Sequence, residues 1–298
     1  MSLQTQPAAP LPSQAGGRLT LPIQTGMDDE VRRLIARLGA DAVRNSDGTE
    51  LPGIVSELAT KVYSTYFVGR GDNAWADAHP DEATRIFLMS DRVAATADGP
   101  VSIDLLASWF ADQVRPDTSC DVTRWWQAHD RTTGQELPAT AWSIGAGGRT
   151  VTVHEALAGH VYTVSFLAFQ TWDPTQMYNY LTNGWDEDPT RVKEKPFDVR
   201  HEATWSHVRA HLSAWLTEHP EVDVVRFTTF FYHFTLVYGA DATERFVDWF
   251  GYSASVSVPA LEAFEEEYGY RLTAEDFVDA GYYNSPFRVP TRAFRDWI

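Results

Sequence analysis

The chain has 298 residues, 44% of them hydrophobic, and a formal net charge of −17 at pH 7. Its length allows one large domain or two smaller ones with a sizeable core. The acidic excess argues against nucleic acid or an anionic membrane surface as partner, because both demand basic patches. A single cysteine, Cys120, rules out an internal disulfide and predicts a reducing, cytoplasmic location. No apolar run reaches the length of about 18 residues that a membrane span needs.

The start of the chain predicts a leader followed by α/β structure. Residues 1–17 are rich in Pro, Ala, Gln, Ser and Gly and lack a signal-peptide pattern, so we expect a disordered leader before a domain over 18–298. Apolar positions on one face predict a helix over Asp28–Leu38, which Gly39 ends. A short strand ending at Arg44 follows, and we expect another helix over Ile54–Tyr66.

The region from about residue 85 to 160 predicts an antiparallel β insertion, because short strand-like segments alternate there with turn signals. The last strand of this region, Val161–Trp172, alternates at first and then becomes almost continuously apolar. A strand that runs from an open sheet into a doubly covered one has this pattern, and we count it among the parallel-type strands.

Apolar periodicity and end signals predict six further elements. In chain order they are a helix that begins at Pro174, a helix over Glu202–Glu218, a strand over Asp223–Phe231, a helix over Asp241–Phe250, a helix over Pro259–Tyr268 and a final helix over Thr291–Ile298.

These elements include three candidate parallel strands, over residues 41–44, 161–171 and 223–231. A closed (β/α)8 barrel needs about eight strand–helix units in roughly 250 residues before insertions. The final helix also lacks a stop signal. We therefore expect the N-terminal part of a (β/α)8 TIM-type barrel with an antiparallel β insertion, truncated before the later barrel strands.

Two arginines stand out because they lie in strand-like segments. Arg226 interrupts the apolar run Asp223–Phe231, and Arg44 ends the first short strand. A guanidinium in such a place is costly unless an anion or strongly polar group meets it, and its planar fork suits phosphate or carboxylate. We expect a polar pocket at the ends of a sheet; an internal ion pair is the alternative for each arginine.

Other polar residues could have either a structural or a functional role. Asp47, in the loop after the first strand, suits a sugar hydroxyl or a simple Asp-Gly turn equally well. His207 and His211 have the spacing of a two-histidine metal face, but no third ligand is evident, so a solvated helix face is favoured and no metal is expected. Cys120 lacks a histidine partner that the sequence can place, so we discount it as a nucleophile.

Six groups of segments together carry a family resemblance. They are Gly39-Ala-Asp-Ala-Val-Arg-Asn-Ser-Asp-Gly-Thr49; Tyr162-Thr-Val-Ser-Phe-Leu-Ala168; Trp172-Asp-Pro174 with Met177-Tyr-Asn179; Asp223-Val-Val-Arg-Phe-Thr-Thr-Phe-Phe-Tyr232; Val247-Asp-Trp-Phe-Gly251; and Tyr268-Gly-Tyr-Arg-Leu272 with Glu275-Asp-Phe-Val-Asp279. In this order they closely resemble the 1,3-β-galactosyl-N-acetylhexosamine phosphorylases, the lacto-N-biose/galacto-N-biose phosphorylases of glycoside hydrolase family 112.

The resemblance implies a partly broken (β/α)8 barrel as the N-terminal catalytic domain of a protein more than twice this length. It implies inverting phosphorolysis of a β-1,3-galactosyl-N-acetylhexosamine to α-galactose 1-phosphate and the N-acetylhexosamine. Inorganic phosphate is then a co-substrate, no cofactor is needed, and the partners are phosphate and the disaccharide. A homodimer of the full-length protein is left open, as is the choice between N-acetylglucosamine and N-acetylgalactosamine.

By position in matching motifs, the resemblance makes Arg44, Asn179 and Arg226 pocket residues and puts Thr175, Trp249 and Tyr252 at the border of the pocket. The family's general-acid aspartate lies in a later Gly-Asp-x-Trp stretch, which this sequence does not contain. No catalytic residue is therefore assigned, and the chain alone is expected to be inactive. A TIM-barrel glycosidase that uses water and a non-catalytic sugar-binding fragment remain as alternatives.

Overall fold

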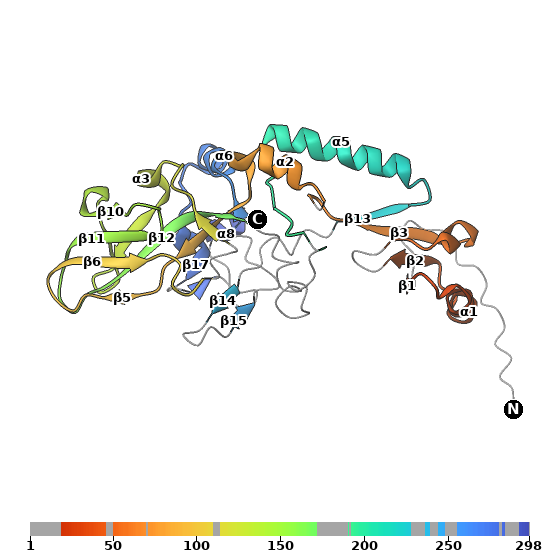
Figure 1. The fold of residues 1–298 in the computed structure, drawn as a ribbon, viewed down its shortest axis with the longest axis horizontal. Coiled ribbons are helices and arrows are strands. Elements are labelled where there is room, and N and C mark those ends of the chain that lie inside the picture. The colour runs from red at the N-terminus through yellow and green to blue at the C-terminus, as the bar shows by residue number, and fades with distance from the viewer. Residues whose placement is uncertain are drawn as a thin grey trace, which may run out of the picture. The chain divides into compact units, whose positions relative to one another are not determined.

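A computed structural model describes most of the chain between residues 19 and 297. The described ranges are 19–45, 50–69, 71–109, 114–171, 190, 192–227, 236–238, 244–247, 255–279, 282–283 and 292–297. The chain divides into two compact units (Figure 1). The parallel-sheet unit holds residues 1–68 and 206–229, and the antiparallel-sheet unit holds residues 69–205 and 230–298.

The parallel-sheet unit contains a four-stranded sheet in the order β1-β2-β3-β13, in which every neighbouring pair is parallel. Its strands are β1 (Thr20–Ile23), β2 (Ala42–Asn45), β3 (Lys61–Tyr66) and β13 (Val224–Phe227). Figure 1 shows β13, far along the chain and coloured cyan, beside the orange β3. The predicted strands that carry Arg44 and Arg226 are thus confirmed as members of one sheet, over the part of each that is described.

Helices cover one face of this sheet. Helix α1 (Asp28–Leu38) ends as predicted at Gly39, which has a left-handed φ of +64° that glycine adopts without strain. Val31 of α1 packs with Val43 and Val62 in a small core. The predicted helix α5 (Glu202–Glu218) is also present, and its Trp215 ring meets Tyr66 edge-on with ring centroids 5.4 Å apart.

The helix expected over Ile54–Tyr66 is wrong. That segment forms a short 3-10 helix, η1 (Gly53–Glu57), and then strand β3. Lys61–Tyr66 is rich in β-branched and aromatic residues, which fit a pleated surface. Pairing with β2 on one side and β13 on the other therefore outweighs the helical reading.

The antiparallel-sheet unit confirms the antiparallel segment expected over about residues 85–160. One sheet has the order β16-β4-β12-β8-β9, with β5 and β7 also paired to β12, and a second has the order β10-β11-β6. The strands are β4 (Arg85–Met89), β5 (Val93–Ala94), β6 (Gly99–Asp104), β7 (Val114–Pro116), β8 (Gln127–Asp130), β9 (Gln135–Glu136), β10 (Trp142–Ile144), β11 (Thr150–Ala156), β12 (Val161–Gln170) and β16 (Ser255–Val256).

Shorter elements of this unit are also described. They are α2 (Asn73–Ala78), η2 (Pro80–Glu82), α3 (Val122–Trp125), η3 (Ala139–Ala141), α6 (Val258–Tyr268), α7 (Ala274–Phe277), α8 (Arg292–Trp297) and the antiparallel pairs β14 (Leu236–Tyr238) with β15 (Glu244–Val247) and β17 (Val278–Asp279) with β18 (Tyr282–Tyr283). Helices α6 and α8 confirm the helices predicted over Pro259–Tyr268 and Thr291–Ile298 within the described range. None of the helices described is long and apolar enough to cross a membrane.

Two further expectations are wrong. Strand β12 is the centre of an antiparallel sheet and not a parallel barrel strand. Its consecutive residues Phe166 and Leu167 are both fully buried, so the strand is covered on both faces and has the apolar pattern of a buried parallel strand. Residues 244–247, expected in a helix, form β15 because they pair with β14. The leader over 1–17 and the helix from Pro174 lie outside the described residues. The described strands form no closed barrel.

A buried ion pair lies in the antiparallel-sheet unit. Arg85 Nε donates to Asp117 Oδ2 at 2.7 Å, and the two side chains are 7% and 0% exposed. Asp117 also accepts from the backbone N–H groups of Ser119 and Cys120, and the Arg85 guanidinium lies 4.2 Å from the Phe169 ring centroid. Each charge is tolerated here because the other compensates it.

We expect Asp117→Asn to lower the free energy of unfolding by about 3–5 kcal/mol, because it leaves a buried guanidinium without its counter-charge. Urea denaturation followed by circular dichroism measures the change. Asp104→Asn is the control, since the Arg149–Asp104 pair is exposed and contributes about 1 kcal/mol or less. Equal losses in the two variants would contradict the assignment.

Candidate functional site

The parallel sheet brings the two predicted arginines to one face. Across β3, Arg44 lies opposite Tyr63 and Arg226 lies opposite Thr65. Paired residues of adjacent strands point to the same side of a sheet, and successive residues of a strand alternate. The side chains of Arg44, Tyr63, Thr65 and Arg226 therefore share one face, which we call the arginine face.

The opposite face of the sheet faces the helices. Val43 and Val62 lie there with Val31 of α1, and Tyr66 meets Trp215 of α5. The arginine face thus belongs to the side that α1 does not cover. In an α/β sheet, strand residues near the carboxyl ends are the usual source of ligand contacts.

Both guanidinium groups are half-buried and oriented by hydrogen bonds. Arg44 Nη1 donates to the Asn45 carbonyl at 3.2 Å, and Arg226 Nη1 donates to Thr65 Oγ1 at 3.3 Å. Arg44 forms no ion pair with any residue that the structure describes, so its alternative structural role is not seen there. Two oriented cationic forks thus lie on one face of the sheet, on either side of β3.

Buried polar groups join β2 to β3 beside the arginines. Asn45, 4% exposed, accepts from the Thr65 N–H through Oδ1 at 2.9 Å and donates to Ser64 Oγ through Nδ2 at 3.2 Å. Because β-ladder pairing between β2 and β3 stops at Arg44 and Tyr63, the Asn45 carboxamide continues the connection one step further.

An ion pair joins β3 to β13 at their amino ends. Asp223 accepts from Lys61 Nζ at 2.7 Å and from the Val62 N–H at 2.9 Å. The Lys61 bond, followed by the backbone bond, lowers the pKa of the Asp223 carboxyl below its ordinary value of 3.8. Both contacts fix the register that places Arg226 on the arginine face.

A cavity of about 510 Å³ lies between the sheet and the last turns of α5. Its lining residues are Asn45, Glu50, Leu51, Ser64, Thr65, Trp215, His219 and Glu221. An indole beside carboxylates and hydroxyls is a lining that sugar sites also use, and the volume suits a small ligand. Asn45 and Ser64 alternate with the residues of the arginine face, so this cavity lies mainly against the opposite side of the sheet.

The other predicted site residues are not placed. Asp47, Thr175, Asn179, Trp249 and Tyr252 lie outside the described residues. Conversely, sequence reasoning did not single out Thr65 or the Asn45 carboxamide. The strand character of Lys61–Tyr66 was the signal that could have found Thr65, because it puts alternate residues on the arginine face.

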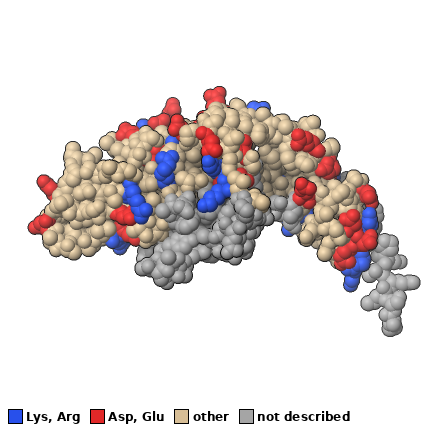
Figure 2. All heavy atoms as spheres, in the orientation of Figure 1, with Lys and Arg blue, Asp and Glu red and all other residues tan. Residues whose placement is uncertain are grey.

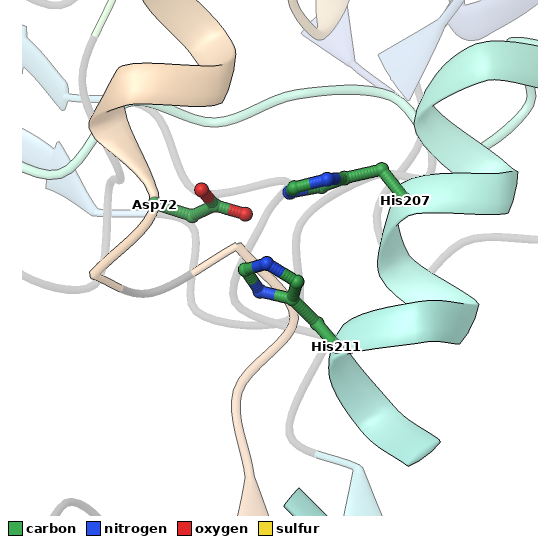
Figure 3. Close-up of side chains that lie close together, drawn as sticks. All are labelled: Asp72, His207 and His211. Atoms are coloured by element: carbon green, nitrogen blue, oxygen red, sulfur yellow. The ribbon is translucent and has the colours of Figure 1, made fainter. Parts of the chain in front are cut away.

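The histidine pair and the cysteine offer little chemistry. His207 and His211 project from one side of α5, with ring centroids 4.1 Å apart (Figure 3). Asp72, also drawn there, belongs to the other compact unit, so the described residues give no three-ligand set within either unit. Burial, and then the Asp117 carboxylate, raises the pKa of the Cys120 thiol to about 12, so the thiol stays protonated and non-nucleophilic near neutral pH.

Charged groups on the visible surface are mixed. On the face drawn in Figure 2, lysine and arginine side chains are interspersed with acidic ones over the coloured residues. That face carries no broad basic surface of the kind that nucleic acid requires.

Comparison with known proteins assigns a family and several relatives. The family model described as the lacto-N-biose phosphorylase N-terminal TIM barrel domain matches residues 17–298. The chain is 45% identical over 281 residues to a 1,3-β-galactosyl-N-acetylhexosamine phosphorylase of Lachnoclostridium phytofermentans, covering 94% of this chain and 38% of the relative. It is 46% identical over 282 residues to the enzyme of that name from Bifidobacterium longum subsp. longum, covering 95% and 37%.

A more distant relative differs in its named substrate. The chain is 35% identical over 284 residues to a D-galactosyl-β-1→4-L-rhamnose phosphorylase of Lachnoclostridium phytofermentans, covering 95% of this chain and 39% of the relative. The chain thus spans less than two fifths of the length of these relatives. The matched family domain is a TIM barrel, which agrees with the predicted fold class. The four-stranded parallel sheet is the part of such a barrel that the structure describes.

We expect the stabilisation by Asp223 to depend on pH. Its carboxyl has a lowered pKa in the folded state, so its contribution is present above about pH 4 and is lost as pH falls through the folded-state pKa. Asp223→Asn should lower the free energy of unfolding by about 1 kcal/mol at pH 7, and by progressively less toward pH 3. Urea denaturation of both proteins at several pH values tests this; a difference that does not change with pH would contradict it.

Proposed function

We propose that this chain, which belongs to the lacto-N-biose phosphorylase family through its N-terminal TIM barrel domain, acts within its full-length protein as an inverting glycoside phosphorylase. The proposed substrates are a β-1,3-galactosyl-N-acetylhexosamine and inorganic phosphate. The products are α-galactose 1-phosphate and the free N-acetylhexosamine. Relatives named for this disaccharide are 45% and 46% identical, against 35% for the one named for a galactosyl-rhamnose, which supports the choice of substrate.

The chemistry is a displacement at the anomeric carbon. A phosphate oxygen forms the new bond to that carbon from one face, while the bond to the hexosamine oxygen breaks on the other and a carboxylic acid gives that oxygen a proton. Phosphate is already a competent nucleophile. The protein must mainly hold it near the sugar and stabilise the charge that develops.

The observation that carries the proposal is the arginine face. Arg44 and Arg226, on either side of β3, are directed to one side of the sheet and near its carboxyl edge. Two guanidinium forks can share the oxygens of one phosphate dianion by charge-assisted hydrogen bonds. We assign them to phosphate and propose no further cofactor and no metal.

The remaining roles are also proposals. Asp47, Thr175, Asn179, Trp249 and Tyr252 are proposed to complete the same pocket around the galactoside. No general acid is assigned within residues 1–298. We place the reaction in the cytoplasm, on the evidence of the single cysteine, and retain a homodimer of the full-length protein as a prediction.

A second candidate is a barrel glycosidase in which water replaces phosphate. A third candidate is a non-catalytic sugar-binding fragment, which the cavity beside Trp215 supports. Neither of these two functions requires inorganic phosphate, whereas the phosphorylase does.

The full-length protein should release galactose 1-phosphate from lacto-N-biose only when inorganic phosphate is present, whereas residues 1–298 alone should release none. Anion-exchange chromatography of the products measures this. Release of free galactose at the same rate without phosphate would favour the glycosidase. Activity of residues 1–298 alone would contradict the claim that they contain no general acid. Calorimetry with the disaccharide then separates sugar binding without turnover from no binding.

Arg44→Gln and Arg226→Gln should each lower kcat/KM for phosphate about a hundredfold, because each removes a charged donor from the reacting group. The double variant should lose less than the product of the two, since both residues hold the same anion. Steady-state kinetics of the full-length protein give these values. Arg32→Gln is the matched control, because Arg32 pairs on the surface with Asp29 and Glu57 and should leave the kinetics unchanged.

A further inference from the structure

We infer that Thr65 is a positioning residue, whose hydroxyl holds the Arg226 guanidinium in the orientation that receives phosphate. The inference rests on the proposed function, and it extends that function to a residue that neither the sequence motifs nor the comparisons single out. It depends on the contact between the two side chains, on how Thr65 itself is held, and on the geometry of a guanidinium.

The contact crosses from one strand to the next. Thr65 is the register partner of Arg226, and its Oγ1 accepts from Arg226 Nη1 at 3.3 Å. An arginine side chain has donors only, so the hydroxyl oxygen must be the acceptor. Thr65 is 8% exposed, which protects this bond from competing water.

Thr65 is fixed from both sides. On one side its strand pairs with β13, and on the other its N–H donates to Asn45 Oδ1 at 2.9 Å, where ladder pairing with β2 has ended. Asn45 is 4% exposed and its amide nitrogen is held by Ser64 Oγ. A β-branched side chain also has few χ1 rotamers. The acceptor therefore stands at a defined point before any ligand arrives.

A fixed acceptor matters because a guanidinium is planar. Holding one Nη1 donor restricts rotation of the whole fork, so less side-chain entropy is lost when the fork binds an anion. Arg44 is held comparably, by its bond to the Asn45 carbonyl on the same edge of the sheet. The two forks, on β2 and β13, are thus pre-oriented, and the oxygens of phosphate match them.

The test uses the full-length protein and varies phosphate and disaccharide separately. Thr65→Val keeps the shape and removes the hydroxyl; it should raise KM for phosphate about tenfold and change KM for the disaccharide less than about twofold. Thr65→Ser keeps the hydroxyl and should stay within about threefold of the unsubstituted protein. Should Thr65→Val fail to fold, Thr65→Ala removes the same hydroxyl without adding a methyl group, and has the same expectation.

Val31→Ala is the structural control, since it removes core contacts between α1 and the opposite face of the same sheet without touching Arg226. It should lower the thermal midpoint and leave KM for phosphate unchanged. The inference is overturned if Thr65→Val leaves KM for phosphate unaltered, if Thr65→Ser raises it equally, if Val31→Ala raises it as much, or if KM for the disaccharide changes instead. A phosphate-independent unsubstituted protein would overturn the proposed function, and the inference with it, before any variant is compared.

Discussion

The parallel pairing of β3 with β13 is the constraint on which the site depends. The Lys61–Asp223 pair joins residues 162 positions apart in the chain, and the Arg226–Thr65 bond joins residues 161 apart. Closing so long a loop costs conformational entropy, although the cost grows only slowly with length. Polar contacts at both ends of the strand pair resist slippage, because a one-residue shift would turn Arg226 to the opposite face.

Much of the intervening segment is folded into the antiparallel-sheet unit, which makes this closure feasible. Residues 69–205 fall in the antiparallel-sheet unit, whose core includes Phe87, Trp126 and Phe166. A compact insertion spans the loop with far fewer conformations than a free chain of equal length. The buried Arg85–Asp117 pair lies inside this unit, whereas Arg44 and Arg226 of the parallel sheet are only half-buried.

Sequence reasoning found the elements whose signals are local. Helix α1 has its apolar stripe and Gly39, and Arg44 and Arg226 were visible as charges in apolar strands. Strand β3 was missed because Lys61–Tyr66 has no long apolar run and becomes a strand through pairing on both edges. β12 was found as a strand but assigned to the wrong sheet, since burial on both faces gives one pattern in parallel and antiparallel surroundings. Thr65 was missed with this strand, because its place opposite Arg226 follows from the register of β3 with β13.

The net charge of −17 sets a condition on how the proposed phosphate site works. These 298 residues provide no net long-range attraction for a dianion, and at physiological salt the field of distant charges fades within about 8 Å. Several other arginines are committed to carboxylates, as in the Arg124 and Arg149 pairs. The proposed site therefore relies on short, oriented hydrogen bonds from Arg44 and Arg226. Such bonds are sensitive to the plane of each guanidinium, so a neutral hydroxyl on the neighbouring strand can matter as much as another positive charge would.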